Sequence, residues 1–287
     1  MKKMYFFLLA VLGMGIAILS ACSDDVVTND VAGNDDVVQT KAPGVAYLVK
    51  TIAITQGVNT ENVTLMYNAQ EEVDSIVWVK AGTTKTGKVS LRTTSKIVVD
   101  INDPDMGEGT RCIYYYTGIS SKRMTKAAYV YARDGYQLDT MAFTYAGGKL
   151  SAIKQDDGTG ALANVYTFAY TGNDFASITD VAAGQSGTCT VGTVEDKSSF
   201  DLNLYHILGV GSNMGELLSC AIWLDLFSYT DHLVTKVAYD ANNYADYTYT
   251  MVGDKATACS VVAHFQDEDE DGNVIEGTNT INVALGY

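Results

Sequence analysis

An eleven-residue phrase that recurs along the chain constrains the fold more than any other feature of the sequence. The copies FTYAGGKLSAI (143–153) and FAYTGNDFASI (168–178) align without a gap, 25 residues apart. Each contains an aromatic residue, a tyrosine two positions later, a turn-forming stretch, a large apolar residue and an isoleucine. Looser copies occur at 66–76, 131–141 and 229–237. A period this short indicates one supersecondary unit that is repeated and that needs its neighbours to cover its apolar face.

Each phrase has the pattern of a β-hairpin. Phe143 and Tyr145 project to one face of a strand, and the glycines that follow supply the positive φ angles that hairpin turns need. Leu150 and Ile153 are three residues apart and would face opposite sides of a regular strand, so either a bulge intervenes or both faces are partly covered. We therefore predict an all-β fold, a large curled antiparallel β-meander that is either barrel-like or an open-shell sheet.

One segment, 198–227, breaks this rhythm because it is richer in leucine. Asn213 and Glu216 form a capping box ahead of an apolar stripe that includes Leu217, Leu218 and Ile222. The pattern predicts one or two short helices near 199–224. We expect them to plug the open side or an end of the curled sheet.

The N-terminus has the features of a bacterial export signal. Lys2 and Lys3 precede an almost wholly apolar run that is too short for a membrane-spanning helix but typical of a secretory signal. Leu19-Ser20-Ala21-Cys22 resembles the lipobox, in which the cysteine is acylated and becomes the new N-terminus. The sequence thus predicts a signal peptide at 1–21 and a lipidated Cys22. Two or more acyl chains would anchor the protein stably to a lipid bilayer.

The residues after Cys22 are acidic and lack aromatic side chains, so 22–42 is expected to be a disordered tether. Ser23, Asp24 and Asp25 resemble the acidic surface-export tag of Bacteroidetes lipoproteins. The remaining residues, 43–287, are long enough for one β-meander domain with a single core. We expect the protein at the outer membrane, lipid-anchored and exposed on the cell surface.

The strand phrases also resemble the YD or RHS type of repeat. Together with the lipobox, they make the chain similar to a family of Bacteroidetes lipoproteins built around a domain of unknown function. This resemblance covers about 47–287 and implies a large, curved, porin-like antiparallel sheet in the cell envelope. It carries no catalytic residue to this chain.

The charge of the chain excludes some classes of partner. The formal net charge is −15, and removing Lys2 and Lys3 with the signal leaves 17 basic against 34 acidic residues, which is −17. Such a chain repels phosphate backbones, so no nucleic-acid partner is expected. The same charge argues against the protein lying flat on anionic lipid. The last strand phrase, NTINVALGY (279–287), ends in an aromatic residue, as last strands of integral outer-membrane barrels do, and such a barrel is the rival architecture. Charged residues near the centres of many strand phrases favour a domain in water.

Motif searches point away from catalysis. The sequence contains no Gly-x-Ser-x-Gly elbow, His-Glu-x-x-His or phosphate-binding loop, and its three histidines are far apart. We therefore expect a non-enzymatic binding or structural module with a glycan or envelope-protein partner; the alternative is a carboxylate-based hydrolase acting on glycans. Tyrosines could form a glycan platform, but their regular positions favour half-buried strand roles. Four further cysteines match no metal pattern, namely Cys112, Cys189, Cys220 and Cys259. An oxidising envelope permits disulfides among them, in any of three pairings, but their apolar or small neighbours favour buried free thiols.

The segment QDEDEDGNVIEG (266–277) resembles the start of a calcium loop. Alternating acidic residues can turn their oxygens toward a hard cation, and Gly272 permits the sharp bend. The candidate ligands are Asp267, Asp269, Asp271, Asn273 and Glu276. The twelfth position is Thr278 instead of the usual glutamate, so calcium binding would be weak. The other interpretation is a solvated acidic hairpin tip without any cofactor.

The calcium interpretation predicts that millimolar calcium raises the melting temperature of chelator-stripped protein by mass action. Magnesium should have a smaller effect, and a variant with Asp269→Asn and Asp271→Asn should not respond. A melting temperature indifferent to calcium would leave the solvated tip as the correct interpretation.

Overall fold

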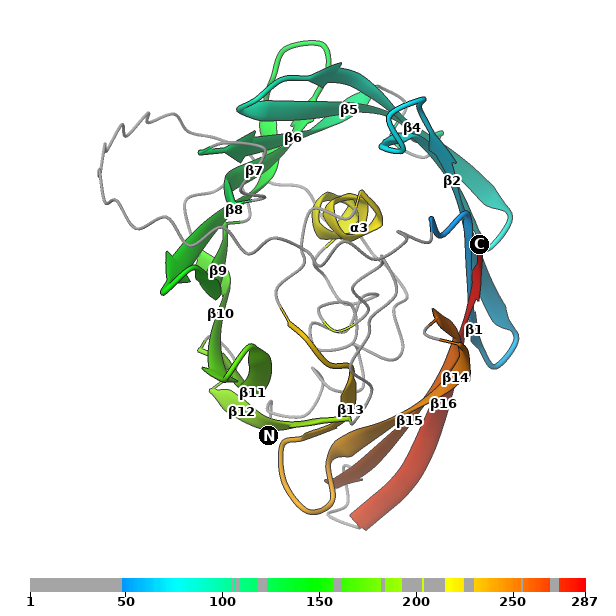
Figure 1. Ribbon diagram of the computed structural model, residues 1–287, viewed down its shortest axis with the longest axis vertical. Coiled ribbons are helices and arrows are strands. Elements are labelled where there is room, and N and C mark those ends of the chain that lie inside the picture. Colours follow the sequence, from blue (N-terminus) through cyan, green and yellow to red (C-terminus); the bar gives the residue numbers. More distant parts are fainter. Residues whose placement is uncertain are drawn as a thin grey trace.

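The computed structural model describes residues 48–104, 106, 109–117, 123–156, 162–181, 184–192, 203, 215–224, 230–253, 255–268 and 274–287. Within these residues it contains one sheet of sixteen antiparallel strands (Figure 1). The strands are β1 (Thr51–Gln56), β2 (Asn59–Tyr67), β3 (Val73–Lys80), β4 (Thr83–Arg92), β5 (Lys96–Asn102), β6 (Thr110–Tyr116), β7 (Met124–Tyr131), β8 (Gln137–Ala146), β9 (Lys149–Asp156), β10 (Leu162–Thr171), β11 (Asp174–Asp180), β12 (Gln185–Val191), β13 (Val234–Ala238), β14 (Tyr244–Val252), β15 (Lys255–Glu268) and β16 (Val274–Gly286).

The sheet closes into a barrel in which each strand pairs with its neighbours in sequence. The seam lies between β1 and β16, where Ile52 pairs with Leu285 and Gln56 pairs with Ile281. The predicted all-β antiparallel meander is therefore confirmed, and its sheet is closed instead of being an open shell. We call the end where odd strands begin and even strands end the N-terminal rim, and the other end the far rim.

Side chains alternate between an apolar interior and a polar outer wall. On β16, Val283 and Leu285 are buried, whereas Thr280, Asn282 and Ala284 are exposed. On β4 the exposed positions include Thr84, Thr86 and Lys88. Transmembrane barrels have the opposite pattern, with an apolar band facing outward. On β4 and β16 the outer wall thus suits contact with water.

The helix α3 (Gly215–Trp223) lies inside the ring of strands (Figure 1). Leu217, Leu218 and Trp223 are at most 2% exposed. The Tyr114 hydroxyl on β6 donates a 2.8 Å hydrogen bond to the Leu217 carbonyl, and the Trp223 ring lies 5.2 Å from that of Trp78 on β3. The short helix predicted near 199–224 is confirmed, but it fills the interior of a closed barrel. None of the described helices has the length and apolar character needed to span a membrane.

Tyrosines near the ends of even strands clasp their own hairpins at the N-terminal rim. Each hydroxyl donates to a backbone carbonyl beside the start of the preceding odd strand. The five bonds are Tyr67 to Val49 (2.5 Å), Tyr145 to Met124 (3.0 Å), Tyr170 to Leu150 (2.9 Å), Tyr249 to Val234 (2.8 Å) and Tyr287 to Ala256 (2.7 Å). In the β3–β4 hairpin the same position is taken by Arg92, which donates to the Val73 carbonyl at 2.8 Å. We call these contacts the hairpin clasps.

Regularly placed bulges explain the spacing of the repeated phrase. In the β8–β9 pair, Thr144 lies opposite Ala152 and Tyr145 opposite Leu150, which leaves Ser151 as an extra residue. Leu150 and Ile153 consequently both face inward and are 0% exposed. Five other pairings have the same extra residue near the start of the odd strand, namely Asp74, Thr125, Ala176, Thr235 and Thr257. Of the two explanations for the three-residue spacing of Leu150 and Ile153, a bulge or a sheet covered on both faces, the structure shows the bulge.

Removing one clasp hydroxyl should weaken the barrel measurably. We expect Tyr170→Phe to lower the free energy of unfolding by about 1 kcal/mol, because the buried Leu150 carbonyl loses a donor while the ring is kept. Urea unfolding followed by circular dichroism measures this difference. Tyr115→Phe is the matched control, since the Tyr115 ring lies on the outer wall beside Lys96, and its free energy should change by less than about 0.5 kcal/mol. Equal losses in both variants would contradict a role for the clasp.

Candidate functional site

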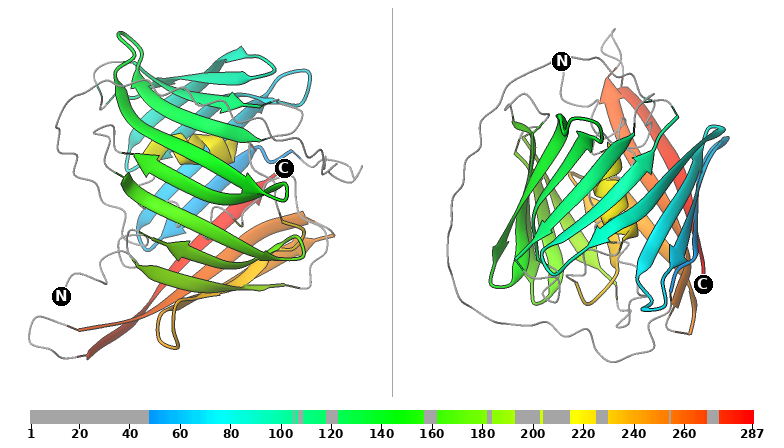
Figure 2. Two further views of the ribbon diagram at one scale, coloured as in Figure 1. Left: turned by 90° about the vertical axis from the view of Figure 1, so that its left-hand side faces the viewer. Right: turned by 90° about the horizontal axis from the view of Figure 1, so that it is seen from above.

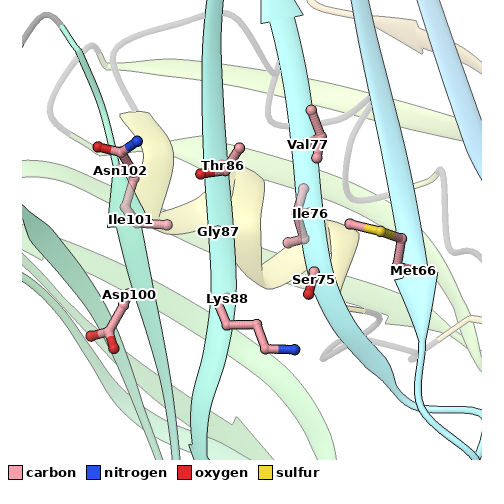
Figure 3. Close-up of a pocket in the computed structure, with 10 residues that line it drawn as sticks. All are labelled: Met66, Ser75, Ile76, Val77, Thr86, Gly87, Lys88, Asp100, Ile101 and Asn102. Atoms are coloured by element: carbon pink, nitrogen blue, oxygen red, sulfur yellow. The ribbon is translucent and has the colours of Figure 1, made fainter.

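A shallow concavity of about 410 Å³ lies on the outer wall over β2, β3, β4 and β5. Figure 3 shows its lining side chains on four adjacent strands, with α3 behind the wall. The outward lining is mixed, with hydroxyl, amide, charged and apolar groups from Met66, Ser75, Val77, Thr86, Lys88, Asp100 and Asn102. This concavity can offer hydrogen-bond donors and acceptors around a small apolar patch.

Pairing register brings these side chains together in rows. Met66 lies opposite Ser75, Ser75 opposite Lys88, and Lys88 opposite Asp100. A second row contains Val77, Thr86 and Asn102. Rows of this kind form wherever directly opposed residues share a face of the sheet. Sequence reasoning missed this site because its residues come from four strands and carry no motif.

The charges at the concavity are balanced by ion pairs. Lys88 pairs with Asp74, and this hydrogen bond lowers the pKa of the Asp74 carboxyl. The carboxylate of Asp100 lies 2.6 Å from the guanidinium of Arg111. A charge-balanced surface with amide and hydroxyl groups favours a neutral polar ligand over a strongly charged one.

Gly87 lies at the centre of the concavity and keeps the wall close to the core. A β-carbon on Gly87 would come within 3.1 Å of Val99 and 3.2 Å of Ile101. The neighbouring β4–β5 pair also shifts register between Val89 and Leu91. Gly87 therefore lets the core side chains of Val99 and Ile101 pack directly behind the strand at this point.

A second polar cluster lies at the N-terminal rim and joins the β10–β11 turn to the chain before β13. One carboxylate oxygen of Asp174 lies 2.6 Å from Nδ1 of His232, and the other accepts backbone N–H groups from Asp231 and His232 at 3.0 and 2.7 Å. Burial would raise the pKa of Asp174, but the hydrogen bonds from His232 outweigh it and lower that pKa. Sequence reasoning missed this pair because 58 residues separate its members.

Buried Asn203 holds the same segment from inside the barrel. Its side-chain amide donates to the Thr230 hydroxyl at 2.6 Å and to the His232 carbonyl at 2.7 Å, and its oxygen accepts the Val234 N–H at 2.8 Å. The Asp174 cluster and Asn203 therefore fix the start of β13 after the long connection that contains α3. Their arrangement indicates a structural junction.

The tyrosines are used mainly for structure in the described part of the chain. Besides the hairpin clasps, Tyr244 on the outer wall has Lys236 3.8 Å from its ring centre on the β13 side and the His264 ring at 4.3 Å on the β15 side. Both faces of the Tyr244 ring are therefore covered and cannot stack on a sugar. Tyr136, at 39% exposed, is the most exposed tyrosine of the described residues.

Cys112, Cys189, Cys220 and Cys259 are buried free thiols, as the sequence predicted. Burial raises the pKa of Cys189 and of Cys259 to about 12, so neither thiol supplies a reactive thiolate at neutral pH. Across the described ranges, no group of three or more His, Cys, Asp or Glu side chains could hold a metal ion.

Most of the residues singled out in the sequence lie outside the described residues. These are Cys22, Ser23, Asp24, Asp25, Asp269, Asp271 and Asn273. Of the other calcium candidates, Asp267 pairs with Ile275 and Glu276 pairs with Gln266, so they occupy adjacent positions of the β15–β16 ladder. Glu276 accepts a 2.8 Å hydrogen bond from the Gln266 amide. Calcium binding stays a prediction.

Comparison with known proteins adds no family assignment. No protein-family model matches the chain, and no curated protein is significantly similar to it.

The Asp174–His232 junction should contribute to stability in a pH-dependent way. We expect Asp174→Asn to lower the free energy of unfolding by about 2 kcal/mol at pH 7, because hydrogen bonds to a charged acceptor are lost. The folded-state pKa of Asp174 is lowered, so its contribution is complete above the unfolded pKa of about 3.9 and is lost as pH falls below that value.

Urea titrations of both proteins at pH 7 and at about pH 3 measure this effect. The difference between wild type and variant should shrink at the lower pH. Glu61→Gln is the control, since its 3.5 Å pair with the exposed Lys80 is a surface ion pair and should change stability little at either pH. A difference for Asp174→Asn that is independent of pH would contradict the assigned role of the carboxylate.

Proposed function

We propose that this protein is a lipid-anchored lipoprotein of the outer membrane, exposed at the cell surface, whose barrel acts as a non-enzymatic binding or structural module of the envelope. The observation that carries the proposal is the combination of a lipobox ending at Cys22 with a barrel in which the outward positions of strands such as β4 and β16 are mainly polar. The outward positions of strands such as β4 and β16 are mainly polar, unlike the lipid-facing positions of a membrane barrel, so attachment would come from the acyl chains.

The described chain starts at the N-terminal rim, since Lys50 donates to the Gly286 carbonyl at the start of β1. A tether running from Cys22 would therefore reach the barrel at this rim. The far rim and the outer wall would remain accessible from outside the cell. The resemblance to Bacteroidetes lipoproteins and the acidic residues Asp24 and Asp25 support surface display.

Binding is supported by the concavity over β2–β5. Its balanced charges and its hydroxyl and amide groups suit a neutral polar partner such as a glycan or an uncharged protein surface. The interior is less suited to chemistry, because α3 and the apolar core occupy it. Turnover of a glycan that a single Asp or Glu substitution abolishes would favour the hydrolase alternative instead.

Anchoring can be tested by changing the one acylation site. We expect Cys22→Ala to abolish labelling by a clickable palmitate and to leave the protein unprocessed or released, because Cys22 would be the sole attachment point. Cys112→Ala is the control, since this cysteine lies in the barrel core and its replacement should leave labelling unchanged. Equal labelling of Cys22→Ala and wild type would overturn the lipoprotein proposal.

Surface display has a separate test. Replacing Asp24 and Asp25 with alanine should leave acylation intact but protect the protein from protease added to intact cells. Continued digestion of this variant would show that the acidic residues do not direct export.

A further inference from the structure

The two longest strands, β15 and β16, extend beyond the rest of the barrel at the far rim (Figure 2, left). On one side, β14 pairs with β15 only as far as His264. On the other side, β1 pairs with β16 only from Ile281 onward. Residues 265–268 and 274–280 thus form a projecting two-stranded ribbon, which we call the far-rim ribbon.

The two edges of this ribbon differ. On the β15 edge, the Gln266 N–H donates to the Asn243 side chain at 3.1 Å, and the Asn242 amide contacts the Gln266 side chain. The turn between β13 and β14 therefore covers this edge. Residues 274–280 pair with β15 on their inner side. On their other side, the β16 edge, no residue in the described part of the chain pairs with them.

Backbone direction identifies the groups on the β16 edge. The Gly286 carbonyl accepts the Lys50 N–H from the β1 side, and successive residues of a strand alternate between neighbours. The backbone N–H and C=O groups of even-numbered residues in β16 therefore point toward β1. Before Ile281, where β1 no longer pairs with β16, the same groups point outward from the β16 edge. The N–H and C=O groups of Glu276, Thr278 and Thr280 lie on this edge, and no strand among the described residues pairs with them there.

Side chains around the edge favour an added strand. Val274 and Ile275 are 58% and 47% exposed, and the segment 274–280 is rich in β-branched residues. Exposed edges are normally blocked by proline, lysine or a covering segment, as on the β15 side. The ribbon carries Asp267, Glu268 and Glu276 but no Lys or Arg, so its charge favours a basic partner.

We propose that the β16 edge of the far-rim ribbon binds an extended, basic segment of a partner protein, which adds as an antiparallel strand along 274–280. Main-chain hydrogen bonds supply affinity in this mode, and side chains next to the edge supply selectivity. A second copy of this chain is a poorer occupant, because two acidic ribbons repel each other. This inference rests on the proposed function as a binding module and names the class of its partner.

The test uses a fluorescent peptide in which lysine alternates with valine or threonine, long enough to cover 274–280. Fluorescence anisotropy measures its affinity for the acylated full chain in detergent. Thr278→Pro removes an edge N–H without disturbing the β15 ladder and should weaken binding about tenfold or more, whereas Thr278→Ala, the matched control, should stay within about twofold. An otherwise identical peptide with glutamate in place of lysine should not bind.

A second measurement does not depend on the folding of a proline variant. A peptide that is N-methylated at alternate residues cannot complete the ladder and should bind about tenfold more weakly to the wild-type chain. Hydrogen exchange at the Glu276, Thr278 and Thr280 amides should slow by at least about tenfold when the unmodified peptide is bound.

Absence of binding, or equal binding of the methylated and unmodified peptides, would overturn the proposal. Edge amides that are already protected in a concentration-dependent dimer, detected by light scattering, would instead identify a second copy as the occupant. The full chain with Cys22→Ala should bind the peptide as the acylated protein does, so failure of the anchoring proposal and failure of this one are distinguishable.

Discussion

Closure of the sheet between β1 and β16 is the constraint on which the rest of the structure depends. Six residue pairs join these strands, from Thr51 with Gly286 to Gln56 with Ile281. Without this seam, two edges of a sixteen-strand sheet would expose their backbone groups and the interior would open to water. With it, the sheet encloses a continuous apolar core, and α3 can fill the space that a barrel of this many strands leaves inside.

Two devices, the bulge and the clasp, act together at the N-terminal rim. The bulge beside the start of an odd strand turns two apolar residues inward, as Leu150 and Ile153 show. The clasp then ties the end of the even strand to that bulged segment, as Tyr170 does at the Leu150 carbonyl. Because bulges increase local twist and curvature, their repetition around the rim also helps a long sheet to close. The phrase recurs in the sequence because the hairpins share this bulge and clasp.

The sequence predicts those parts of the fold that depend on local patterns. Alternating aromatic residues and glycine turns identify the hairpins, and the capping box before Leu217 identifies the helix. The spacing of Leu150 and Ile153 left two explanations open, a bulge or a sheet covered on both faces, and the structure shows the bulge. Closure was not predictable, because the β1–β16 pairing joins residues at opposite ends of the chain. The concavity and the Asp174–His232 junction were missed for the same reason, since each forms from separate strands and leaves no local pattern.

The hairpin clasps have a consequence for how such a barrel can change in evolution. Each clasp joins the two strands of one hairpin, so a hairpin carries its own closing contact when it is duplicated or deleted. A single strand inserted within a hairpin would separate its tyrosine from the acceptor carbonyl, and it would reverse all later strands, so that β16 could no longer pair antiparallel with β1. Barrel size should therefore vary in steps of two strands, and both ends of the barrel sequence should stay at one rim. Diameter can then adapt to a new internal filling while the local chemistry of the rim stays unchanged.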